Sequence, residues 1–293
     1  KINPFASCLP LAAQLPVFLS LFYMLRTDLR YDICPEVNPP GTPNPQPCGD
    51  GGDASFFFIP DLTNKATGAV LVVLIILYVG SQLASTLLIL LPTALWVTSI
   101  TDGRPGVRAL FARVFRWRFG VGWWLVVLFG LPVIALLLGL IFGGSLQVAD
   151  LGSVLIKQLG SILLAVVVIN LWEETVWAGF FQTRLEARFN FVVAAALTAL
   201  PFAGVHVPLL LLDDHVSVLS VLKGIAGLVI LGVVVRLLMG VTMRAALDSV
   251  LAVGILHQIF DASNNNGGLV DSLLDGVDAG NMTQLAAVIL TVL

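Results

Sequence analysis

The sequence predicts an all-α polytopic membrane protein, a transmembrane helical bundle of about seven to eight spans. Of its 293 residues, 58% are hydrophobic and only 11% are charged, whereas soluble domains carry about 25% charged residues. The mean hydropathy is +0.97, and apolar runs of about twenty residues, the length that crosses a bilayer as a helix, recur along the chain. This composition excludes a soluble enzyme, a nucleic-acid-binding protein and a disordered chain.

The apolar runs define the expected spans in order. The first lies at about 5–25 and is followed by a polar loop, 26–65, rich in Pro, Gly and Asp. The second stays apolar to about residue 100, and Pro92 is expected to kink or end its helix. The later spans are expected at 121–143, 151–188, 191–207, 218–241 and 244–262, with a partial eighth at 282–293. Because the chain begins with Lys and this last run is short, both ends are expected to continue in a longer protein.

The positions of the basic residues predict the orientation. Five arginines lie within residues 102–118, and arginine-rich loops stay on the cytoplasmic side. With this stretch inside, the later arginines fall inside as well: Arg184, Arg188, Arg236 and Arg244. Loop 26–65 and the acidic loops near 213 and 271–278 then fall outside. Cys34 and Cys48 could pair if their loop faces an oxidising compartment.

Ionisable side chains inside apolar helices are costly, so they mark candidate functional sites. Five such residues are present: Glu173, Glu174, His206, His257 and Asp261. His257 and Asp261 share a helix face because they are four residues apart. The two glutamates point about 100° apart, so at most one can point directly into a site.

Depth and chemistry group these residues in one site. If spans four and five form a hairpin with its turn at 189–190, Glu173 and His206 lie at equal depth near the middle of the bilayer. A carboxylate in a low-dielectric site is a competent general base, and an imidazole can hold water or donate to an oxyanion. The group is suited to activating water. Glu173, His206 and His257 could instead ligate zinc, although the sequence has no HExxH motif.

Each candidate also has a structural interpretation. Either glutamate could form a buried ion pair with Arg184 or Arg236. His206 could cap a helix end, and Asp261 could mark a helix exit. Trp177 could pack in the bundle or anchor it at the membrane interface.

From about residue 92 to the end, the chain resembles the CPBP family of intramembrane proteases, also called the CAAX protease and bacteriocin-processing, or Abi, family. The three family motifs appear in order on separate spans: Glu173-Glu174, Phe202 to His206, and His257 to Asp261. The stretch TDGRPGVRALFARVFRWRFGVGWW before them is also typical of the family. One position departs from the pattern, because Ala178 stands where the first motif usually ends in Arg.

The resemblance implies a role for each ionisable residue. Glu173 would activate the water and Glu174 would support it. His206 would help to position that water, while His257 and Asp261 would stabilise the tetrahedral oxyanion.

The resemblance also bears on substrate and cofactor. Phe202, the first residue of the second motif, and Trp177, three residues after the first motif, are expected to contact substrate. The glutamate-dependent mechanism of relatives requires no metal cofactor, and the alternative is one zinc ion. The replacement of the usual Arg by Ala178 is expected to affect either substrate contact or the orientation of the glutamates.

Residues 1 to about 90 are similar to the middle of a YidC/Oxa1-type membrane insertase from an actinobacterium. The similarity rests on NPFASCLPLAAQLPVFLSLFYMLR, on the external loop and on SFFFIPDLTNKATGAVLVVLIILYVGSQLAS. The similar region covers two spans of the insertase. It includes neither the earlier span that carries the Arg of the hydrophilic groove nor the later spans. The expected domains are therefore residues 1–90 and 91–293, joined by natural fusion, by a gene-calling artefact or by engineering.

The main interpretation is an intramembrane endopeptidase in the plasma membrane of a bacterium, an actinobacterium by the insertase resemblance. Its expected partners are the lipid bilayer and membrane-embedded or lipid-anchored peptide or protein substrates, without nucleic acid. The first alternative is an insertase function carried by residues 1–90. The second is a non-catalytic membrane partner on the same fold, which Ala178 favours.

Overall fold

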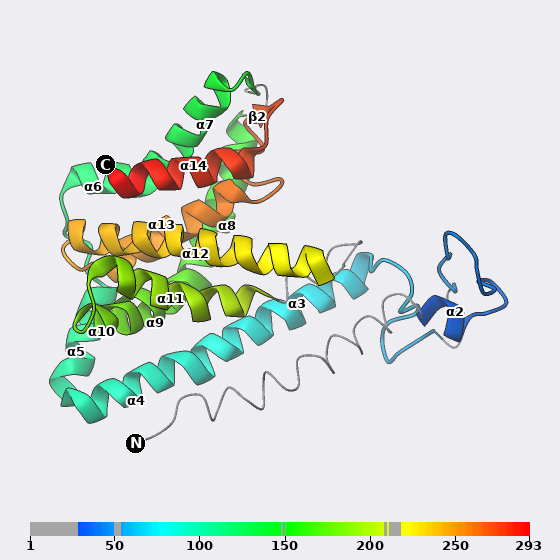
Figure 1. The fold of residues 1–293 in the computed structure, drawn as a ribbon, viewed down its shortest axis with the longest axis horizontal. Coiled ribbons are helices and arrows are strands. Elements are labelled where there is room, and N and C mark those ends of the chain that lie inside the picture. Colours follow the sequence, from blue (N-terminus) through cyan, green and yellow to red (C-terminus); the bar gives the residue numbers. More distant parts are fainter. Residues whose placement is uncertain (1–28, 50–53, 148, 150, 208–209, 211–217) are drawn as a thin grey trace. The chain divides into compact units, whose positions relative to one another are not determined.

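The computed structural model describes residues 29–49, 54–147, 149, 151–207, 210 and 218–293. The described residues are mostly helical, with one two-stranded sheet, so the all-α prediction is confirmed (Figure 1). The chain divides into two compact units, Lys1–Ser81 and Gln82–Leu293. The span expected at 5–25 and the acidic loop near 213 lie outside the described residues.

Three described helices are long and apolar enough to cross a membrane: Val121–Ile141, Leu151–Glu186 and Leu219–Ala245. Shorter apolar helices cover Thr86–Thr101, Phe191–His206 and Ala279–Val292. These helices make the chain a multi-pass membrane protein. The number of seven to eight spans stays a prediction.

The first unit contains a cross-linked polar loop after the short helix α2 (Leu29–Ile33). Cys34 and Cys48 form a disulfide, so the pairing that the sequence left open is present. Arg30 donates to the carbonyls of Thr63, at 3.0 and 2.7 Å, and of Pro45, at 2.9 Å. These contacts tie both halves of the loop together ahead of α3 (Gly68–Ser85).

Pro92 does not end its helix, contrary to one of the two expected outcomes. The helix passes from α3 through a π turn, η2 (Thr86–Leu90), into α4 (Leu91–Thr101). The same arrangement precedes Pro132, where α6 (Val121–Leu125) continues through η3 (Val126–Gly130) into α7 (Leu131–Ile141). Proline lacks an N–H and its ring collides with the carbonyl four residues earlier, and the wider π turn accommodates both defects.

The expected fourth span is one continuous helix of 36 residues, Leu151–Glu186. It consists of α8 (Leu151–Ala165), η4 (Val166–Asn170), α9 (Leu171–Val176), η5 (Trp177–Gln182) and α10 (Thr183–Glu186). The chain then turns where the sequence predicts, because Asn190 caps α11 (Phe191–His206) by accepting the N–H of Val193 at 3.0 Å.

The last three helices complete the bundle. They are α12 (Val218–Ala245), α13 (Val250–Asn264) and α14 (Ala279–Val292). The seventh span was expected from residue 244, which is wrong, because α12 continues to Ala245 and Ser249 caps the start of α13 by accepting the N–H of Ala252 at 3.1 Å. Helix α13 is buried along most of its length and packs against α9, α12 and α14, so it forms the core of the second unit (Figure 1).

The two ends of this bundle differ in charge. At one end, α5 (Gly103–Val114) and the turns before α11 and α13 are joined by Arg184–Asp102, Arg244–Glu186 and a bond from Arg116 to the carbonyl of Leu247. Residues 101–121, 183–191 and 241–250 carry eight arginines and three acids. At the other end, β1 (Ser145–Leu146) pairs antiparallel with β2 (Leu274–Asp275), and residues 264–280 carry three aspartates without Lys or Arg.

Candidate active site

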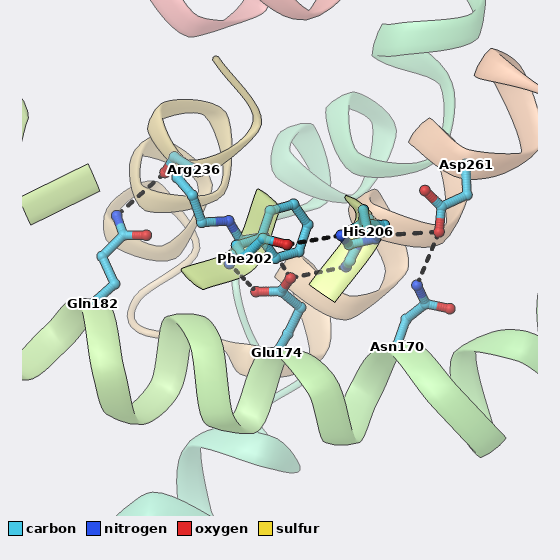
Figure 2. Close-up of polar contacts among 8 residues, drawn as sticks. Asn170, Glu174, Gln182, Phe202, His206, Arg236 and Asp261 are labelled. Carbon is cyan, nitrogen blue, oxygen red and sulfur yellow. Dashed lines mark hydrogen bonds and ion pairs between the residues drawn. The ribbon is translucent and has the colours of Figure 1, made fainter. Parts of the chain in front are cut away.

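Glu174 is the anchor of the polar cluster inside the bundle. It projects from α9, and its side chain is 0% exposed. Arg236 binds it bidentately, with Nη1 at 3.0 Å from Oε2 and Nη2 at 2.5 Å from Oε1 (Figure 2). The Nδ1 atom of His257 lies 2.8 Å from the same Oε1 atom. Since one guanidinium and one imidazole engage this carboxylate, its position is fixed.

Arg236 comes from α12 and is also 0% exposed. Its side chain is buried against Glu174 within the bundle, and its expected place at the cytoplasmic side stays a prediction. Its guanidinium carbon lies 4.4 Å from the centroid of the Phe202 ring, and its carbonyl accepts from Gln182 Nε2 at 3.2 Å. A buried arginine needs a compensating charge, and the structural interpretation that paired a glutamate with Arg236 is correct for Glu174.

His257 and Asp261 lie one turn apart on α13, as their spacing predicts. The Nε2 atom of His257 lies 3.8 Å from Asp261 Oδ2, which is longer than a hydrogen bond. Asn170 from η4 donates to that same oxygen at 3.2 Å. The His257 side chain is buried, whereas the Asp261 side chain is 39% exposed, so Asp261 lies at the accessible side of the cluster.

Phe202 and His206 close the cluster from α11. His206 Nδ1 lies 2.8 Å from the Phe202 carbonyl oxygen, and their rings are 4.8 Å apart. The Phe202 ring also lies 5.8 Å from that of His257 and 5.9 Å from that of Trp177. Phe202 and Trp177 are buried, so both support the cluster by packing, and their contact with substrate stays a prediction.

Glu173 differs from its neighbour. It is half-buried, and it lies close enough to Glu174, His257 and Asp261 to interact with them electrostatically. The two glutamates therefore have separate environments, as their angular separation requires. The structure brings all five predicted ionisable residues into one group, while their catalytic roles stay predictions.

Sequence reasoning missed two supporting residues, Asn170 and Gln182. Asn170 is a polar residue in an otherwise apolar run three positions before Glu173, which is the only sequence signal it gives. Gln182 Nε2 joins the Arg236 carbonyl to Glu186 Oε1, at 3.2 Å from each. The contacts of Asn170 with Asp261 and of Gln182 with the Arg236 carbonyl join different helices, so only the packing identifies those partners.

The residues do not form a preassembled metal site. Within the part of the chain that the structure describes, no group of three or more His, Cys, Asp and Glu side chains is placed to hold a metal ion. Both nitrogens of His257 face carboxylates, those of Glu174 and Asp261. Zinc held by Glu173, His206 and His257 stays the alternative prediction.

Comparison with known families gives two matches. Residues 155–263 match the family described as type II CAAX prenyl endopeptidase Rce1-like, and residues 1–137 match the 60Kd inner membrane protein family. No curated protein and no solved structure matches the chain. The first match contains all five ionisable residues of the cluster. One segment of the chain is thus similar to a CAAX protease family and another to the YidC/Oxa1 insertase family. Both resemblances are confirmed, and the boundary near residue 90 stays a prediction.

Proposed function

We propose that this chain, in which an Rce1-like CAAX protease segment is joined to a 60Kd inner membrane protein segment, is an intramembrane endopeptidase of a bacterial plasma membrane. One observation carries the proposal. Arg236 and His257 occupy the Glu174 carboxylate, which leaves Glu173 as the glutamate able to act on water. Both matched families imply membrane-embedded protein substrates.

In the proposed reaction, Glu173 removes a proton from a water molecule as the water oxygen attacks the carbonyl carbon of the substrate peptide bond. His206 positions that water. The His257 imidazole, oriented by Glu174 at Nδ1, offers Nε2 to the oxyanion, and Asp261, held by Asn170, lies beside that nitrogen to assist. The tetrahedral intermediate collapses when the C–N bond breaks and Glu173 returns its proton to the leaving amine.

The two glutamates give the sharpest test of this mechanism. The Glu173→Gln variant keeps size and hydrogen bonding but removes the base, so kcat is expected to fall about 100- to 10,000-fold, the usual contribution of a general base. Its thermal stability in detergent should not change. The measurement is cleavage of a membrane-peptide library, including peptides with a prenylated C-terminal cysteine, by the full chain in nanodiscs.

Matched controls separate chemistry from folding. Glu36→Gln, at an exposed position of the first unit, should keep full activity. Glu174→Gln should lose activity together with stability, because it leaves Arg236 buried without a counter-charge. Cleavage that persists in Glu173→Gln would overturn the mechanism, and inactivity of the unmodified chain on every substrate would favour the non-catalytic partner. Cleavage that stops on chelation would favour zinc.

A second candidate function, membrane protein insertion, is favoured by the match of residues 1–137 to the 60Kd inner membrane protein family. The full chain would be expressed in a bacterium depleted of its own insertase, beside the Glu173→Gln variant. Growth rescue by both proteins would support insertion and would separate it from peptide hydrolysis. The peptidase proposal predicts that neither protein rescues growth.

A further inference from the structure

A groove lies at the arginine-rich end of the second unit, apart from the candidate active site. It has a volume of about 320 Å³ and lies between α5 and the η5–α10 segment. Its walls include Thr98, Ala109, Arg113, Thr183 and Arg184. The groove therefore combines two guanidinium groups with two hydroxyl groups where the helices end.

Arg113 links this groove to the π turn η5. Its Nη1 donates to the Gly179 carbonyl at 2.9 Å, and its Nη2 donates to Thr183 Oγ1 at 3.1 Å. Its Nε atom is buried without an acceptor in the described structure. An arginine has five N–H donors, so these contacts fix the side chain without using its full capacity.

Arg184 forms the opposite wall. Its Nη2 atom pairs with Asp102 and donates to Thr101 at 2.9 Å, and its guanidinium carbon lies 4.9 Å from the Phe180 ring centroid. Asp102 is the one acid on the groove wall, so the lining keeps a positive formal charge. The surrounding end of the bundle adds to it, with eight arginines against three acids in residues 101–121, 183–191 and 241–250.

The neighbouring surface suits a lipid better than a free anion. Trp96 and Ile100 lie within one turn of Thr98 along α4, on the opposite face of that helix, and each is 64% exposed. Tryptophan prefers the level of the lipid headgroups, and basic pockets between transmembrane helices bind anionic headgroups. We propose that this groove binds the phosphate headgroup of an anionic phospholipid between Arg113 and Arg184.

The test is a lipid titration of the full chain in detergent, followed by native mass spectrometry. The probes are dioleoyl phosphatidylglycerol, dioleoyl phosphatidylcholine and inorganic phosphate. We expect one retained phosphatidylglycerol, bound at least about tenfold more tightly than phosphatidylcholine. Arg184→Gln should weaken phosphatidylglycerol binding by about tenfold or more, since a hydrogen bond to a charged group contributes about 1.5–3 kcal/mol.

Two further pairs of variants keep the test decisive. Ala109→Leu fills the groove without changing any charge, and Ala112→Leu is its control on the same helix outside the groove lining. Arg108→Gln removes an exposed arginine from α5 outside that lining and controls for general electrostatic attraction. We expect loss of binding in Ala109→Leu and changes of less than about fivefold in both controls, the size that about 1 kcal/mol per surface arginine allows.

Three results would overturn the proposal. Equal affinity for the two lipids would exclude recognition of an anionic headgroup. Equal weakening by Arg108→Gln and Arg184→Gln would assign the attraction to the whole basic face. Displacement of phosphatidylglycerol by millimolar inorganic phosphate would identify a free-anion site. If Arg184→Gln fails to fold, the comparison of phosphatidylglycerol binding by Ala109→Leu and Ala112→Leu decides the question. This comparison does not depend on peptidase activity.

Discussion

Glu174 and Arg236 are both 0% exposed, and each can remain charged inside the bundle because of the other. The contact is bidentate, the geometry that makes guanidinium–carboxylate pairs strongest. The pair also places a carboxylate oxygen 2.8 Å from His257 Nδ1. A structural ion pair and the orientation of a candidate catalytic histidine thus depend on one side chain.

Breaking this pair from one side should be costly. Arg236→Met leaves Glu174 as an uncompensated buried charge, so we expect the free energy of unfolding to fall by about 3–5 kcal/mol. The double variant Glu174→Gln/Arg236→Met removes both charges, so its free energy of unfolding should fall by less than that of Arg236→Met alone. Unfolding in mixed micelles by a chemical denaturant measures both.

The surface pair Arg244–Glu186 is the matched control for the variants of the Glu174–Arg236 pair. Its arginine side chain is 54% exposed, and Arg244→Gln should cost about 1 kcal/mol or less. If Arg236→Met lowered the free energy of unfolding by as little as Arg244→Gln does, water would reach the Glu174 carboxylate. The argument that the pair is buried would then fail.

Among helices, the one that carries both glutamates has an unusual construction. The six residues of α9 lie between two π turns, η4 and η5. Each π turn shifts the rotation of the residues after it relative to an uninterrupted α-helix. The spacing of Asn170, Glu174 and Gln182 in sequence therefore does not give their directions, which explains why sequence reasoning found neither Asn170 nor Gln182. The carbonyls of Ala178 and Gly179 in η5 are satisfied by Thr183 and Arg113.

The cross-linked loop of the first unit carries a pH-dependent element. Asp61 accepts the N–H of Gly49 at 2.9 Å, the N–H of Thr63 at 2.8 Å and the Thr63 hydroxyl at 2.5 Å. Burial alone raises the pKa of this carboxyl, but these hydrogen bonds, together with the charge of Arg30, outweigh it and hold the pKa below its ordinary value of 3.8. The folded loop therefore binds a proton less readily than the unfolded loop.

The sign of this shift fixes the expected pH response. The stabilisation is complete above the ordinary value of 3.8 and is lost as the pH falls through the lower pKa of the folded loop. Amide hydrogen exchange of 45–49 and 54–65, corrected for intrinsic rates, should be constant between pH 7 and 5 and lose protection below about pH 4. Asp61→Asn should remove this dependence, whereas Asp32→Asn, at an exposed position on α2, should retain it. Protection that falls equally in Asp61→Asn would exclude Asp61 as the cause.

At the scale of the whole molecule, the second unit has a basic end and an acidic end. Because arginine-rich segments stay in the cytoplasm, the end that contains α5 should face inward and the β1–β2 end should face outward. This arrangement also sets the proposed lipid groove against the cytoplasmic leaflet, whose surface is negative.

Cysteine labelling tests this orientation. In a Cys8→Ser background, Asp275→Cys at the acidic end should react with a membrane-impermeant maleimide in intact spheroplasts. Arg108→Cys on α5 should react at least about tenfold more slowly until the membrane is permeabilised. Labelling in the opposite order would invert the topology, and equal labelling of both positions would show that the maleimide crosses the membrane.

The sequence by itself determined the helical membrane fold, the hairpin turn at 189–190 and the residues of the ionisable cluster. These follow from composition, from a polar break between apolar runs and from the cost of charges in lipid, all of which are local properties. The tertiary structure decided which glutamate is paired, that Arg236 lies inside the bundle, and that Asn170 holds Asp261. Each of these is a contact between different helices, and the π turns set the rotation of the central one, so no spacing along the chain specifies them.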